Sequence, residues 1–144
     1  MKKKILFFVC TVFLSAGFVS CNKDDDGDSN ASIVGKWEFY KTSEYLNGEV
    51  IYEEMWSDIS LCPSKKDYVK FESNGDFMQV NHDEDCEAET EMGTYTVSGN
   101  TLEIDSGFDI MSLDIVSITG SKLIVEEQEV YEGITYKYRT ELRK

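Results

Sequence analysis

The chain has 144 residues, with 14 lysines and arginines against 28 aspartates and glutamates, and a net charge of −14 at pH 7. So acidic a surface repels phosphate backbones and anionic lipid headgroups, which excludes nucleic acid as a partner. Residues 33–144, which follow an N-terminal leader and a charged segment, are enough for one domain with one hydrophobic core and too few for two.

The first twenty residues have the pattern of a secretory signal peptide. Lys2, Lys3 and Lys4 form a cationic start, an apolar run over 5–14 follows, and small residues stand at 15–17. The apolar run is shorter than the roughly 20 residues that span a bilayer. The alternative is an uncleaved anchor helix, but the acidic sequence that follows lacks a stop-transfer pattern. We therefore expect residues 1–20 to be removed.

The segment Phe18-Val19-Ser20-Cys21 resembles a lipobox, in which a small residue precedes a cysteine that becomes lipidated and N-terminal. Two or three acyl chains on one cysteine hold a protein firmly, because each buried methylene contributes about 0.8 kcal/mol. The resemblance implies that Cys21 carries the lipid and that this lipid holds the chain on a membrane.

Residues 21–32 are expected to be the lipidated cysteine and an acidic, flexible tether. The run from Asn22 to Asp28 contains four aspartates and is too polar to pack into a core. A calcium loop is a poor alternative, because the glycine and glutamate of an EF-hand are not at the required offsets. The run resembles the acidic export signal of surface lipoproteins in one Gram-negative phylum. That resemblance implies a location on the outer face of the outer membrane.

Cys62 and Cys86 remain once Cys21 is assigned to the lipid and Cys10 to the leader. In an oxidising export route such a pair favours a disulfide, which would stabilise the domain by about 3 kcal/mol in the chain-entropy model. The alternative is a zinc site, but His82 is the only histidine, so acidic residues such as Asp83 or Asp85 would have to complete it. We expect the disulfide, and neither a metal nor a cofactor.

Residues 33–144 predict a series of short strands separated by turn residues, which is typical of a β-sandwich or barrel. Asn47-Gly48 and Asn74-Gly75 are strong hairpin signals. Irregular sequence is expected over 57–66 and an acidic loop over 83–91. The expected strands cover 33–46, 50–56, 68–72, 77–82, 93–97, 101–105, 111–118, 123–130 and 134–142.

The last of these stretches alternates in polarity. Its apolar-side residues are Ile134, Tyr136, Tyr138, Thr140 and Leu142, and its polar-side residues are Thr135, Lys137, Arg139 and Glu141. One buried face and one wet face indicate an antiparallel sheet. Consecutive strands joined by short hairpins favour an all-β, up-and-down barrel of about eight strands, since closure removes exposed edges.

Several strings resemble the bacterial lipocalin-like family, whose members are mostly uncharacterised small outer-membrane lipoproteins. They are Ile33 to Trp37, Val69 to Phe77, Gly93 to Leu102, Ile115 to Ile118 and Leu123 to Val125. The family's pattern has cysteines on both sides of the hairpin at Asn74-Gly75, which supports the disulfide. The resemblance covers residues 33–142 and implies a lipocalin-like barrel with a ligand cavity. It assigns no catalytic residue to this chain.

Six aromatic residues at alternating strand positions are candidates to line such a cavity: Trp37, Phe39, Phe71, Tyr95, Tyr136 and Tyr138. Each could instead be an ordinary core residue, because an eight-stranded barrel is either filled by side chains or holds one small ligand. Trp56 ends a predicted strand, where it would either guard the mouth of the barrel or cap the core.

No motif indicates an enzyme. His82 is interpreted as an exposed polar loop residue, and no phosphate-binding loop or metal-binding histidine pair is present in the sequence. The leading hypothesis is a membrane-anchored protein that binds a small apolar ligand or acts as a cell-envelope accessory. The alternative is a protein-interaction module that presents the acidic loop 83–91, stapled by Cys62 and Cys86, to a basic partner. The sequence identifies no partner protein.

Overall fold

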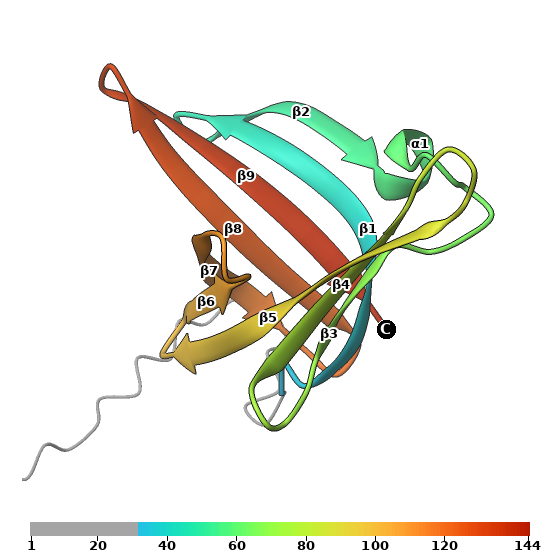
Figure 1. Ribbon diagram of the computed structural model, residues 1–144. Helices are drawn as coiled ribbons and strands as arrows, with labels where there is room; N and C mark the ends of the chain where they lie inside the picture. The colour runs from blue at the N-terminus through green and yellow to red at the C-terminus, as the bar shows by residue number, and fades with distance from the viewer. Residues whose placement is uncertain (1–31) are drawn as a thin grey trace, which may run out of the picture.

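A computed structural model describes residues 32–144, which form a closed antiparallel β-barrel (Figure 1). The predicted all-β fold class is confirmed, whereas the predicted signal peptide and the lipidated Cys21 lie outside the described residues. The elements are β1 (Gly35–Leu46), β2 (Glu49–Met55), α1 (Trp56–Ile59), β3 (Tyr68–Phe71), β4 (Asp76–His82), β5 (Ala88–Ser98), β6 (Thr101–Asp105), β7 (Ile110–Ile118), β8 (Lys122–Tyr131) and β9 (Ile134–Arg143).

Eight strands close the barrel and β2 lies outside it. Strands β3 to β9 pair in sequence order, and β1 joins the two ends by pairing with both β3 and β9. Strand β1 is long enough to pair with two strands along the same edge. Its residues 35–38 pair with β3, and its residues 41–46 pair with β2. Between these two partners the chain forms α1 and the segment 60–67, so the barrel wall is interrupted there.

Two glycines show why the chain turns and bends where it does. Asn47 and Gly48, in the β1–β2 turn, have φ of 49° and 89°, the left-handed backbone that a two-residue hairpin turn needs. Gly93 lies against the end of β6, and a Cβ there would come within 2.1 Å of the Asp105 carbonyl oxygen. Only glycine therefore allows β5 to pass this close to β6.

The hydrophobic core fills one end of the barrel. Trp37 and Leu123 are completely buried there, with Leu142 and Ile33 beside them. The Trp37 Nε1–H donates to the Ile33 carbonyl oxygen at 2.6 Å, and the Lys144 ammonium lies 4.2 Å from the centroid of the Trp37 ring. The described chain thus begins and ends at this closed end.

The opposite end has walls of unequal height, as Figure 1 shows. Residues 88–93 of β5 pair only with β4, and residues 127–131 of β8 pair only with β9. The shorter β6–β7 hairpin stands between these two projecting walls. The barrel is therefore open at this end, which we call the mouth. Within residues 32–144, no helix has the length and apolarity to cross a bilayer.

Candidate ligand-binding cavity

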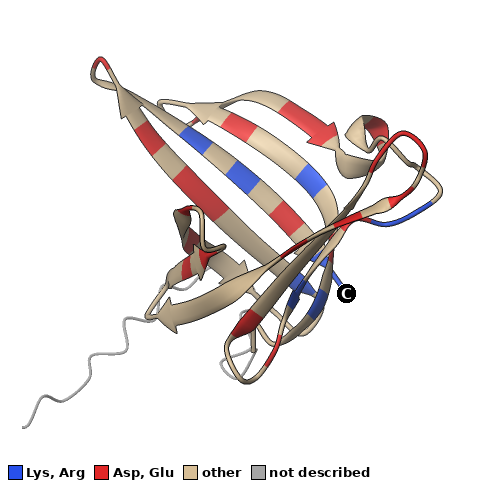
Figure 2. Ribbon diagram, in the orientation of Figure 1, with Lys and Arg blue, Asp and Glu red and all other residues tan. Residues whose placement is uncertain are grey.

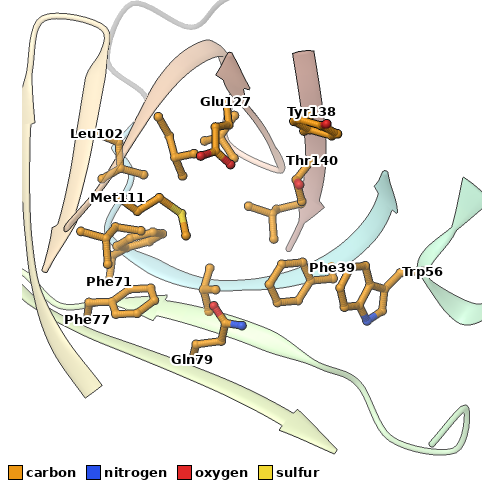
Figure 3. A pocket seen from close by; sticks show the side chains of 15 residues that line it. Phe39, Trp56, Phe71, Phe77, Gln79, Leu102, Met111, Glu127, Tyr138 and Thr140 are labelled. Carbon is orange, nitrogen blue, oxygen red and sulfur yellow. The ribbon is translucent and has the colours of Figure 1, made fainter. Parts of the chain in front are cut away.

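A cavity of about 280 Å³ lies inside the barrel between the core and the mouth (Figure 3). Its volume is close to the lower end of the range for small-molecule sites, roughly 300–1,000 Å³. Met111 and Tyr138 in its wall are exposed to solvent, so the cavity opens outward. Its lining comprises Phe39, Trp56, Val69, Phe71, Phe77, Gln79, Leu102, Ile104, Met111, Leu113, Val125, Glu127, Tyr138, Thr140 and Leu142.

Strand alternation explains this lining. Successive side chains of a strand point to opposite faces, so Leu102 and Ile104 of β6 face inward while Glu103 between them faces solvent. The same rule places Tyr138, Thr140 and Leu142 of β9 in the wall, as the alternation of that strand indicates. The lining is therefore mostly aliphatic and aromatic, with a few polar groups from Gln79, Thr140, Tyr138 and Glu127.

The structure brings three of the six candidate aromatic residues into the cavity wall: Phe39, Phe71 and Tyr138. The lining does not include the other three. Trp37 is buried in the core below the cavity. Tyr95 packs edge-on against Phe71, with ring centroids 4.9 Å apart, and its hydroxyl donates to the Glu72 carbonyl oxygen at 2.8 Å. Tyr136 stands one pleat nearer the mouth than Tyr138.

Trp56 is part of the cavity wall and begins α1 rather than ending β2. Its indole stacks on the Phe39 ring, with centroids 4.4 Å apart and an interplanar angle of 21°. The indole Nε1–H donates to Asp67 Oδ2 at 2.8 Å. Both contacts fix the Trp56 ring at the interruption between β2 and β3. A local sequence pattern could not predict the position of this ring.

The buried Asp67 holds this interrupted wall together. Besides Trp56, its carboxylate accepts hydrogen bonds from the backbone N–H of His82 at 2.8 Å and from His82 Nδ1 at 2.9 Å. Its own carbonyl oxygen accepts from the Phe39 N–H at 3.1 Å. Burial raises the pKa of Asp67, but the hydrogen bonds from Trp56 and His82 outweigh burial, so the pKa lies below its ordinary value.

The interpretation of His82 as an exposed loop residue is wrong. His82 is the last residue of β4, and only 10% of its side chain is exposed. Its partner Asp67 is more than a dozen residues earlier in the chain and becomes its neighbour only when β3 pairs with β4. The ring thus serves as a fixed donor to a buried carboxylate.

Cys62 and Cys86 form the predicted disulfide, with Cα atoms 5.2 Å apart. Because the two cysteines bond to each other, the alternative of a zinc site at this pair is ruled out. Within residues 32–144, moreover, no three His, Cys, Asp or Glu side chains are grouped as metal ligands would be. The bond ties the segment after α1 to the β4–β5 connection.

The predicted acidic loop over 83–91 is too long. Residues 88–91 belong to β5, where they pair with β4 from Gln79 to His82, because the hairpin register continues past the predicted boundary. The actual connection is a tight turn in which Asp83 Oδ1 accepts from the backbone N–H groups of Asp85 and Glu87 at 2.9 and 2.8 Å. The turn therefore has its own internal hydrogen bonds besides the disulfide.

Charges are sorted between the two faces of the barrel wall. Figure 2 shows acidic bands along β8 beside basic bands and one acidic band along β9. On the outer face the buried Glu126 accepts from Lys137 at 2.6 Å and from Arg139 at 2.7 Å. Burial raises the pKa of Glu126, but hydrogen bonds from these two cations outweigh burial and lower it overall. Its neighbour Glu127 points the other way, into the cavity.

The sequence profile of the lipocalin-like domain matches residues 33–125. The chain belongs to the lipocalin-like domain family. The lipocalin-like domain is also similar to solved structures of low sequence identity. One is a lipocalin-like protein from Bacteroides uniformis, at 19% identity and a TM-score of 0.48, with 74% of this chain and 96% of that chain covered.

Two further structures are similar to this lipocalin-like domain. An uncharacterised protein from Bacteroides eggerthii has 16% identity and a TM-score of 0.45, covering 75% of this chain and 98% of that one. A deswapped triple mutant of bovine odorant binding protein has 14% identity and a TM-score of 0.43, covering 76% and 72%. A comparison with curated proteins finds no match.

The cavity of the lipocalin-like domain is suited to non-covalent binding. Its apolar wall would exclude water from a ligand's hydrocarbon surface, and its few polar groups could orient the ligand. Trp56 and Phe39 offer a stacked aromatic surface on one side. Lipocalin-like domains typically bind small hydrophobic ligands, and this geometry is compatible with that activity.

Proposed function

We propose that this protein is a lipid-anchored lipoprotein of the bacterial outer surface whose barrel binds a small, mainly apolar ligand. The observation that carries the proposal is the cavity of about 280 Å³, with an apolar wall and an opening at the mouth. A barrel whose interior was filled by side chains would offer no such volume. The ligand would enter at the mouth and lie against Phe39, Trp56 and Phe71.

The anchor is supported by the leader pattern and by Cys21, together with one feature of the fold. Ile33, the first residue of the domain, is buried at the closed end of the barrel, and the mouth is at the opposite end. A tether that leaves the closed end would orient the mouth away from the membrane. This arrangement favours capture of a ligand from the surroundings of the cell.

A neutral fluorescent probe tests the ligand-binding part of the proposal. N-phenyl-1-naphthylamine fluoresces strongly in apolar surroundings, so titration with the purified domain should give saturable binding. Gln79→Trp should weaken binding by about tenfold or more, because the larger side chain occupies the cavity. Mass spectrometry of the natively purified protein would then identify the bound species.

Met78→Trp is the matched control. Met78 lies between Phe77 and Gln79 on β4, so its side chain points to the opposite face of the strand from the two cavity residues. This variant should bind the probe like the wild type, and thermal melts should show that both variants are folded. Absence of saturable binding to the wild type, or equal loss in both variants, would refute the proposed cavity.

A further inference from the structure

Carboxylates stand in register on the inner face of the barrel near the mouth. Tyr138 of β9 pairs with Glu127 of β8 on one side and with Glu44 of β1 on the other. Directly paired residues of an antiparallel sheet share a face. Since Tyr138 and Glu127 line the cavity, Glu44 faces inward as well. Two carboxylates therefore flank one tyrosine across three adjacent strands.

The opposite wall of the mouth is acidic too. A smaller hollow of about 220 Å³ shares Phe77, Gln79, Ile104 and Met111 with the main cavity, so the two are contiguous. The hollow adds Glu91 and Asp109 to the lining. Acidic groups thus face the entrance from the β4–β5 wall and from the β6–β7 turn.

These inner carboxylates lack the cations that neutralise the outer ones. Neither hollow has a lysine or an arginine in its lining. Lys137 and Arg139, which flank Tyr138 in the sequence, point to the outer face and bind Glu126. Among the described residues, neither Glu44 nor Glu127 takes part in an ion pair. The entrance consequently has a negative potential without an internal counter-ion.

The negative potential at the entrance acts on the Tyr138 hydroxyl. Partial desolvation in the cavity wall raises the pKa of Tyr138, and the negative charges of Glu129, Glu44 and Glu127 raise it further. Glu129 pairs with Tyr136, one pleat closer to the mouth than the row of Glu44, Tyr138 and Glu127. The carboxylates therefore act together on one small region at the top of the cavity.

We infer that the cavity selects an amphiphilic cation, whose apolar body fills the interior and whose ammonium group lies beside Tyr138 between Glu44 and Glu127. This inference rests on the proposed function and specifies its ligand class. An ammonium group would donate hydrogen bonds to the carboxylates and would be attracted to the tyrosine ring. A fatty acid entering with its head group at the mouth would instead place a negative charge beside Glu127.

Three probes with the same hydrocarbon chain and different head groups test the inference: octylammonium, octanol and octanoate. Each is measured by calorimetry and by displacement of N-phenyl-1-naphthylamine at neutral pH. Octylammonium should bind about tenfold more tightly than octanoate, with octanol in between. The preference should shrink as salt is added, because salt screens charges that remain partly exposed.

Glu127→Gln and Glu44→Gln should each reduce the preference for octylammonium over octanoate, measured as the ratio of the two affinities, by several-fold. The matched control is Glu103→Gln, which removes one negative charge from the outer face of β6 and should leave the preference as it is. Because Glu44 and Glu127 are both partly exposed and outside the ion pairs, these variants should fold normally.

The outcomes separate this inference from the proposed function. If octanol binds but octylammonium binds no more tightly than octanoate, the amphiphilic cation is ruled out and an apolar ligand remains. The same holds if Glu103→Gln changes the preference as much as Glu127→Gln does. If none of the three probes binds, the proposed cavity itself is refuted.

Discussion

The indole of Trp56 stacks on the ring of Phe39, with ring centroids 4.4 Å apart, while its Nε1–H is bonded to the buried carboxylate of Asp67. The Trp56 side chain thereby closes the cavity at the interruption between β2 and β3. Its N–H also donates a hydrogen bond to a buried, charged carboxylate. The Trp56 side chain therefore forms part of the wall at the point where backbone pairing along β1 passes from β3 to β2.

Replacing Trp56 by phenylalanine separates these two roles. Phenylalanine can still stack on Phe39, but it leaves Asp67 without one of its donors. Loss of a hydrogen bond to a charged group should lower the free energy of unfolding by about 1.5 to 3 kcal/mol, measured by urea denaturation. Trp56→Ala, which loses the stacking as well, should be less stable still. A Trp56→Phe variant as stable as the wild type would contradict this role of the indole N–H.

Asp67 should make stability depend on pH in the acid range. Because its pKa is lower in the folded protein, its contribution is complete above the ordinary aspartate pKa of about 3.9 and is lost as the pH falls through the lowered value. Asp67→Asn should therefore be less stable than the wild type at neutral pH, and the difference should shrink on acidification. Thermal melts over a pH series measure this.

The exposed Asp114 of β7 provides the control, since Asp114→Asn removes the same charge without touching a buried network. Its stability should follow that of the wild type throughout the pH series. A stability deficit of Asp67→Asn that stayed constant from neutral to acid pH would show that the lost contribution is not the ionised carboxylate.

The disulfide should stabilise the domain without forming part of the cavity. Cys62 and Cys86 are 24 residues apart, and neither lines the cavity. The paired change Cys62→Ala and Cys86→Ala should lower the free energy of unfolding by about 3 kcal/mol, through greater freedom of the unfolded chain. Binding of N-phenyl-1-naphthylamine at a temperature where the variant is folded should be retained. Loss of binding in a folded variant would place the disulfide in the site.

Cys21→Ala should release the protein from the membrane into the soluble fraction, because it removes the side chain that we propose carries the acyl groups. Cell fractionation with immunoblotting provides the measurement, and mass spectrometry should show the loss of acyl chains. Cys10→Ala is the control, since Cys10 lies in the predicted leader and its change should leave the proposed anchor intact. A Cys21→Ala protein that stays membrane-bound would overturn the anchor proposal.

The sequence alone determined the local features of this protein. The turns at Asn47-Gly48 and Asn74-Gly75 and the faces of the last strand follow from backbone preferences and strand alternation, which involve only neighbouring residues. Those rules were sufficient to predict an antiparallel barrel, but of the six aromatic residues that they offered for the cavity only Phe39, Phe71 and Tyr138 line it.

Closure of the barrel decided the rest, because it brings together residues that are distant in the chain. It excludes β2 from the closed sheet and buries Trp37 below the cavity. The pairing of β3 with β4 joins Asp67 to His82, and the same carboxylate binds Trp56. Closure also aligns Glu44, Tyr138 and Glu127 across three strands, so that charges scattered over the sequence face one entrance. The register of the β8–β9 hairpin is set locally by its turn, but the pairing of β1 with β9 joins the two ends of the domain, and no single stretch of sequence contains that register.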